Sequence, residues 1–312
     1  MGWCCAFKAA CTLDYQSQKV IIMDLVTILD IAIGGLLMGG IYALIAMGLS
    51  LQYGVARVLN IAHGEFIMLG AFATWMLYTA FGISPLISLV IVGPLIFIIG
   101  FLLHRTLFRS LLKSSPSLPA FEGSSLLATF GLLYIIQNIA IIVWSSASRG
   151  YTYLASPVNL WGAVFAANRL VTLGFAVGIG LAFYLFLART RLGKAIRAAA
   201  QDPATAGLMG VNINQVLALC FGLGAVMAGF AGVLLSMCFP IQATMGLGYT
   251  IIAIIVVVLG GLGSIPGSFI GGFMLGIIGS VVTYIEPSLT VAAFYLIFIL
   301  LLLVRPKGIM GK

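Results

Sequence analysis

The sequence predicts an all-α fold, a polytopic bundle of transmembrane helices with eight or nine crossings, some of them broken or re-entrant. Composition is the first observation behind this prediction. Of the 312 residues, 62% are hydrophobic and only 7% are charged, whereas about a quarter of an ordinary soluble domain is charged. The second observation is that most of the chain divides into apolar stretches of about 20 residues, the length that a helix needs to cross a bilayer.

The third observation is the distribution of charge. A net charge of +8 would also suit a nucleic-acid-binding protein. The basic residues, however, lie mainly in short loops between apolar runs, as they do in membrane proteins. We therefore exclude a nucleic-acid partner and expect a lipid bilayer around the chain.

The chain opens with a leader, residues 1–22, which lacks the clear hydrophobic core of a signal peptide. Because Met23 follows it directly, the native start is either Met1 or Met23. Residues 23–312 then form one transmembrane domain. Its candidate crossings lie at 28–52, 60–81, 84–104, 124–145, 169–188, 214–238, 248–264, 267–285 and 288–304.

The seventh and eighth crossings are short, and they are separated by clustered glycines and Pro266. Since proline and glycine interrupt helices, these segments are either two full crossings or broken and re-entrant pieces. Two full crossings here give a total of nine, whereas broken or re-entrant pieces give eight.

The basic residues also predict the orientation, because cytoplasmic loops are enriched in Lys and Arg. Eleven of the fifteen lie on one side, which we assign to the cytoplasm: Arg57, Arg105, Arg109, Lys113, Arg189, Arg191, Lys194, Arg197, Arg305, Lys307 and Lys312. The other side holds Arg149, Arg169, Lys8 and Lys19. The N-terminus is then outside and the C-terminus cytoplasmic, which requires an odd number of crossings and favours nine.

Small residues four positions apart predict close packing between the helices, because backbones can approach each other where side chains are small. The pairs are Gly35 with Gly39, Ala225 with Gly229, Ala228 with Gly232, Gly267 with Gly271, and Gly272 with Gly276.

The longest polar interval between crossings, 189–213, is predicted to hold a short capped helix over 203–209. Asp202 suits the N-cap, Pro203 the first helical position and Gly210 the left-handed residue after the last turn. Such a knob, with apolar Leu208, suits docking into a cleft of another protein. The alternative is an interfacial loop helix that only orients the chain. The candidate docking residues are Arg197, Asp202, Pro203, Ala206, Gly207, Leu208 and Gly210.

A second group of polar residues opens the crossing at 60–81. Ionisable groups at membrane depth are costly, and they usually face a cavity or a partner. The candidates for a pathway or a broken helix are Asn60, His63, Gly64 and Glu65, with Gln137 and Asn138 in a later crossing. The alternative is that His63 and Glu65 lie at the cytoplasmic interface and satisfy interrupted backbone, and that Gln137 and Asn138 form hydrogen bonds between helices.

The sequence offers no catalytic, metal or cofactor site. The stretch 259–272 is rich in glycine but lacks the Gly-Lys-Ser/Thr ending of a phosphate loop, so we expect a tight turn between packed helices. The only histidines are His63 and His104, and no Ser/His/Asp set is credible. The energy for transport must come from another subunit or from a gradient. A secondary transporter with His63 and Glu65 as a proton relay, and a passive solute channel, are the rival hypotheses.

Several ordered motifs resemble those of the permease subunits of branched-chain amino acid ABC transporters, a family that includes urea and amide importers. The motifs are YALIAMG (42–48), NIAHGE (60–65), TRLGKAIRA (190–198), GLMGVN (207–212) and LGGLGSIPG (259–267). The resemblance runs from about Met23 to the C-terminus. It implies an inner-membrane pore made with a second, related permease chain, and an extracytoplasmic substrate-binding protein. It also implies cytoplasmic ATPase subunits that bind the ATP, on which the 202–210 helix is seated. Branched-chain or other apolar amino acids are the first implied substrates, and urea or short amides the second.

Overall fold

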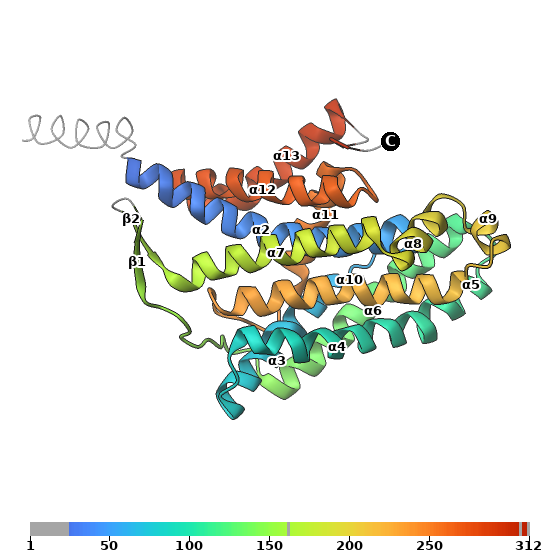
Figure 1. Ribbon diagram of the computed structural model, residues 1–312, viewed down its shortest axis with the longest axis horizontal. Helices are drawn as coiled ribbons and strands as arrows, with labels where there is room; N and C mark the ends of the chain where they lie inside the picture. Colours follow the sequence, from blue (N-terminus) through green and yellow to red (C-terminus); the bar gives the residue numbers. More distant parts are fainter. Residues whose placement is uncertain (1–24, 161–162, 306–307, 311–312) are drawn as a thin grey trace, which may run out of the picture.

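The computed structural model describes residues 25–160, 163–305 and 308–310, and the leader 1–22 lies outside these ranges. Long helices that run in roughly the same direction make up most of the molecule (Figure 1). The elements are α2 (Leu25–Ala56), α3 (His63–Phe81), α4 (Pro85–Leu103), η1 (His104–Phe108), α5 (Arg109–Ser114), α6 (Leu118–Trp144), β1 (Pro157–Leu160), β2 (Ala163–Ala166), α7 (Ala167–Arg189), α8 (Arg191–Gln201), α9 (Pro203–Leu208), α10 (Ile213–Ser236), α11 (Gly246–Gly260), α12 (Ile265–Ile285), η2 (Pro287–Leu289) and α13 (Thr290–Val304).

The all-α membrane bundle predicted from the sequence is confirmed. Within the described ranges, eight helices are long and apolar enough to cross a membrane, and α11 is shorter. The chain nevertheless traverses the bundle between α10 and α12. Ile241, just after α10, pairs through its backbone with Arg149 in the loop that precedes β1, whereas Gly263, just before α12, lies beside Gly54 near the end of α2. This part of the chain consists of an irregular segment, 237–245, followed by α11, so the seventh predicted crossing is represented by a helix of 15 residues.

Helices α2 and α12 pack through the small residues that the sequence analysis singled out. A Cβ on Gly39 would lie 2.8 Å from the Cα of Phe273, and a Cβ on Gly276 would lie 2.3 Å from backbone atoms of Gly39. Any larger side chain at these positions would separate the two helices. Glycine therefore allows the close backbone contact that substitutes for a hydrophobic driving force in lipid.

The outer surface of the bundle is apolar. Helices α4, α6 and α13 expose many large aliphatic side chains, among them Ile98, Leu127 and Leu303. By contrast, α10 and the middle of α2 are buried. Exposed apolar surface on a chain of this composition fits contact with lipid chains.

A short hairpin closes one end of the bundle, in a stretch for which the sequence analysis predicted no element. Strands β1 and β2 are antiparallel, with Pro157 opposite Ala166. They lie at the end opposite α8 and α9 (Figure 1). Nearby, Arg149 and Ile241 exchange two backbone hydrogen bonds of 2.9 and 2.8 Å, which tie this loop to the irregular segment before α11.

Candidate functional site

Helices α8 and α9 form a projection at one end of the bundle, beside the end of α2 and the start of α10 (Figure 1). Helix α8 begins at a Thr190 cap, whose hydroxyl accepts from the N–H of Gly193 at 3.0 Å. Gly193 is packed so closely on the end of α7 that a Cβ there would lie 2.2 Å from the carbonyl oxygen of Leu187. The base of the projection is therefore held firmly against α7.

Helix α9 has the capping that the sequence predicts, although it ends one residue earlier, at Leu208. The Asp202 carboxylate accepts from the N–H of Ala204 at 2.9 Å, and Gly210 adopts a left-handed conformation with φ +86°. A hydrogen bond from the Thr205 hydroxyl, together with those from backbone N–H groups, keeps the pKa of Asp202 below its ordinary value. Local capping thus stabilises both ends of this short helix.

The tip of this projection carries apolar side chains that no part of the described chain covers. Leu208 is 89% exposed and Met209 is 82% exposed, whereas Ala206 is buried beneath them. We call Leu208 and Met209 the α9 tip. Arg191 and Lys194 are exposed on the adjoining α8. An exposed apolar tip beside basic residues has the form of a docking element.

Arg197, one of the predicted docking residues, has a different immediate contact. Its guanidinium donates to the carbonyl oxygen of Leu187 at the end of α7. The C-terminal carbonyls of a helix have no partner within the helix, so this bond satisfies one of them. In this structure Arg197 anchors α8 to α7.

A second candidate region lies deep in the bundle, where the chain between α2 and α3 is not helical. His63 Nε2 is 3.1 Å from the carbonyl oxygen of Ile45. Ile45 is eleven residues before the end of α2, or about 16 Å along the helix axis. His63 and Glu65 are both fully buried within the protein, and His63 lies beside α2 well before that helix ends. Segment 57–62 folds back into the bundle after α2 ends.

Polar side chains form hydrogen bonds with the non-helical backbone of this segment and with one another. Thr250 of α11 is the central group: its hydroxyl accepts from the N–H of Gly64 at 2.8 Å and lies 3.0 Å from the carbonyl oxygen of Ile61. Asn60 donates to Gln52 at 3.3 Å, and Gln52 donates to the carbonyl oxygen of Phe221 at 3.0 Å. Exposed polar backbone is not tolerated in lipid, so such bonds are required where a spanning helix breaks.

The N-termini of α3 and α11 meet at this point, and we call their contact the helix junction. A Cβ on Gly64 would lie 1.8 Å from the carbonyl oxygen of Gly246, the first residue of α11. A Cβ on Gly246 would in turn lie 2.3 Å from Oε1 of Glu65. The Glu65 carboxyl thus faces the positive end of α11. Neither of its oxygens has a hydrogen-bond partner among the described residues.

Gln137 and Asn138 lie apart from this junction, on α6. Gln137 is half-buried, and Asn138 is exposed and donates to the carbonyl oxygen of Tyr134 in its own helix at 2.8 Å. The structure therefore does not bring them together with His63 and Glu65. Two further residues, Thr250 and Gln52, were not among the predicted site residues. Both form hydrogen bonds in this region with segments far away in the sequence.

These features define the class of protein. A bundle of apolar helices in which the N-termini of α3 and α11 meet in the interior, and which carries a capped projection at one end, has the features of a membrane transport subunit. In agreement, residues 31–304 match the family described as branched-chain amino acid transport system, permease component. The chain belongs to this family.

Relatives from several organisms match nearly the whole chain. It is 32% identical to the high-affinity branched-chain amino acid transport system permease protein BraD of Pseudomonas aeruginosa, over 90% of this chain and 94% of that protein. It is 30% identical to the corresponding protein LivH of Escherichia coli, over 89% and 94% of the two chains. A probable LivH of Methanocaldococcus jannaschii is 27% identical over 89% and 91%.

Proposed function

We propose that this chain is a pore-forming subunit of an ATP-driven importer of branched-chain or other apolar amino acids. The names of its relatives and the family match support the substrate class. In this proposal residues 23–312 form the permease domain, with the coupling segment at 189–213. The pore pairs this chain with a second permease subunit, and an extracytoplasmic binding protein delivers the substrate.

The orientation in this proposal follows from the basic residues. The end of the bundle that carries α5, α8 and α9 holds most of the Lys and Arg, and loops of this kind face the cytoplasm. The hairpin β1–β2 then faces outward, toward the binding protein, and the C-terminus is cytoplasmic.

The single observation that carries the coupling role is the α9 tip. Two large apolar side chains that are more than four-fifths exposed are expensive to leave in water, since burial of one such side chain contributes about 1.5–3 kcal/mol. A cleft on a cytoplasmic ATPase subunit would cover them. The rigid caps at Asp202 and Gly210 would then transmit movement of that subunit to α7, α8 and α10.

The test places a charge on the tip. Leu208→Glu is expected to abolish ATP-dependent uptake and to weaken co-purification of the ATPase subunits, because a carboxylate cannot be buried in an apolar cleft without a partner. The matched control is Val164→Glu, an exposed apolar residue in β2 at the opposite end, which should leave ATPase association intact. Normal uptake and normal association in Leu208→Glu would refute the coupling role.

We further propose that the helix junction lines the translocation pathway. N-termini of broken helices at mid-membrane attract polar groups of a substrate, and the unpaired carboxyl of Glu65 offers an acceptor for hydrogen bonds from an ammonium group. Glu65→Gln should reduce uptake while leaving ATPase association unchanged. Uptake driven by a pH gradient in the absence of ATPase subunits would instead support a secondary transporter.

A further inference from the structure

A small basic pocket lies between the end of α4 and the start of α10, at the same end of the bundle as α9. Its cavity volume is about 210 Å³, and it is lined by Phe101, His104, Arg105, Arg109, Asn212, Asn214, Gln215 and Ala218. Two of these residues are arginines and none is a carboxylate. The volume is well above the roughly 30 Å³ that one water molecule occupies in the liquid.

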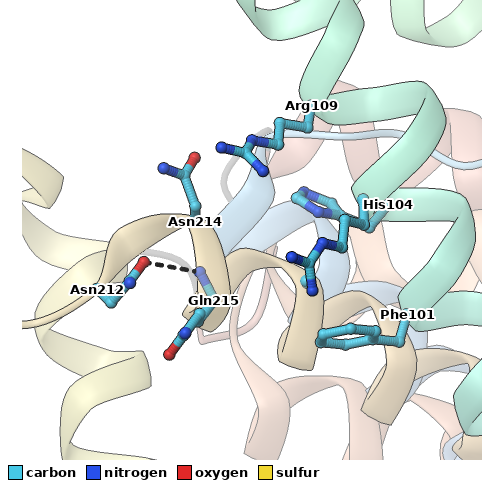
Figure 2. A pocket seen from close by; sticks show the side chains of 8 residues that line it. Phe101, His104, Arg109, Asn212, Asn214 and Gln215 are labelled. Carbon is cyan, nitrogen blue, oxygen red and sulfur yellow. Dashed lines mark hydrogen bonds between the residues drawn. The ribbon is translucent and has the colours of Figure 1, made fainter.

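The basic residues are brought together by an irregular turn of the helix. At η1 the N–H of Arg109 donates to the carbonyl oxygen of His104, five residues earlier, so this turn is wider than an α-helical turn. Such wide turns occur frequently at functional sites. In the resulting arrangement the side chains of Arg109 and His104 point toward Asn214 across the pocket (Figure 2).

Two buried nitrogen atoms at the pocket have no hydrogen-bond partner in the part of the chain that the structure describes. The His104 side chain is only 4% exposed, and its Nδ1 has no hydrogen-bond partner among the described residues; the same holds for the buried Nε of Arg109. Arg105 and Arg109 line the same pocket, and their like charges repel each other there. The lining of the pocket therefore carries two positive charges and several hydrogen-bond donors but no anionic side chain.

The opposite wall is the N-terminus of α10, a helix of 24 residues. The first N–H groups of a helix have no partner within it, and the helix dipole is positive there. The side chain of Asn212 accepts from the N–H of Gln215 at 3.2 Å (Figure 2) and so uses one of them. Helix N-termini are common sites for phosphate groups.

The surface beside the pocket indicates where such a phosphate group comes from. Leu95, Ile98 and Leu102 are exposed on α4, and their spacing of three and four residues places them on one face of the helix. The same spacing continues to Arg105. An exposed apolar stripe thus leads directly to the basic pocket.

We propose that this pocket binds the phosphate of an anionic phospholipid headgroup, with the acyl chains lying along the stripe on α4. Arg105, Arg109 and His104 donate to the phosphate oxygens, and Asn214 and the first turn of α10 complete the site. Basic pockets between helices at the membrane surface are suited to such headgroups. The bound lipid would join α5 to α10 directly beneath the α9 projection.

The test uses the purified full-length chain in neutral detergent, with bound lipid counted by native mass spectrometry during titration. Dioleoyl phosphatidylglycerol should bind the wild type at one tight site, and dioleoyl phosphatidylcholine should not. Arg109→Gln should weaken phosphatidylglycerol binding about 10- to 100-fold, as expected for one lost charge-assisted hydrogen bond. Lys113→Gln is the control, because it removes an equal charge from the exposed face of α5 outside the pocket.

Thermal unfolding separates the two sources of phosphate. Phosphatidylglycerol should raise the unfolding temperature of the wild type and of Lys113→Gln but not that of Arg109→Gln, whereas inorganic phosphate at the same concentration should have no effect. An equal rise with inorganic phosphate that is lost in Arg109→Gln would overturn the lipid in favour of a free anion. Equal loss of binding in Lys113→Gln, or no tight site in the wild type, would overturn the pocket itself. If Arg109→Gln does not fold, Arg105→Gln, which alters an exposed side chain of the pocket, replaces it in both measurements, with the same expected and contradicting results.

Discussion

The helix junction makes a quantitative prediction about Gly64. In Gly64→Ala the new Cβ would lie 1.8 Å from the carbonyl oxygen of Gly246 and 2.5 Å from the Thr250 hydroxyl. Real Cβ atoms do not approach other atoms closer than about 3.0 Å, so α3 and α11 must separate by more than an ångström. The carbonyl is part of the backbone, and no rotation of a side chain relieves the contact.

The expected loss of folding stability in Gly64→Ala has two contributions. Overpacking a tight interior typically costs about 1–3 kcal/mol. Separation of the helices also weakens the bond from the Gly64 N–H to Thr250, worth about 0.5–1.5 kcal/mol. We therefore expect Gly64→Ala to reduce the free energy of unfolding by about 2–4 kcal/mol, measured with a denaturing detergent on the purified chain.

Gly131→Ala is the matched control for this measurement. Gly131 lies within α6, and a Cβ there meets nothing within 4 Å. Alanine is the better helix former, so this change should stabilise the protein by up to about 1 kcal/mol. If Gly64→Ala proved as stable as Gly131→Ala, the close contact between the N-termini of α3 and α11 would be refuted.

Two further predictions concern single side chains. Thr250→Val keeps the shape of the side chain but removes the hydroxyl that serves Gly64 and Ile61. The protein should lose about 1–3 kcal/mol of stability in the same unfolding assay, the cost of an unsatisfied buried group, and an unchanged stability would show that these bonds contribute nothing. The pKa of Asp202 is lowered in the folded protein because the Thr205 hydroxyl and nearby N–H groups donate to it. Its stabilisation of α9 is therefore complete above the ordinary pKa of about 4 and is lost as the pH falls through the lowered value. Amide exchange in residues 203–209, corrected for the intrinsic effect of pH, should lose protection at acid pH in the wild type. In Asp202→Ala that protection should be low at every pH, and equal protection in the two proteins would contradict the cap.

Local features of this chain could be predicted from the sequence because they depend on neighbouring residues. The cap at Asp202 and the left-handed Gly210 are set within a few residues. Close helix packing at Gly35, Gly39, Gly272 and Gly276 could be predicted, because small residues recur four positions apart there. Which helices pack together, with Gly39 of α2 against Gly276 of α12, can be seen only in the structure.

The depth of His63 and Glu65 could not be predicted in the same way. Glu65 follows Arg57 by only eight residues, so a position near the cytoplasmic surface was reasonable. In the structure α2 extends to Ala56, and the chain then turns back, held by Thr250 from almost 190 residues away. A sequence pattern carries no direct record of such distant contacts. The basic pocket could not be predicted either, because Arg105 and Arg109 indicate only the orientation of the chain when they are considered without the wide turn at η1.

The most direct test of the account is the location of the α9 tip in living cells. Met209→Cys, in a chain whose native cysteines are replaced by alanine, provides a single exposed thiol at this tip. A membrane-impermeant maleimide should label it in inverted membrane vesicles but not in intact cells, and co-expressed ATPase subunits should protect it. Labelling in intact cells would place α9 on the outer face and would contradict the proposed coupling to a cytoplasmic motor.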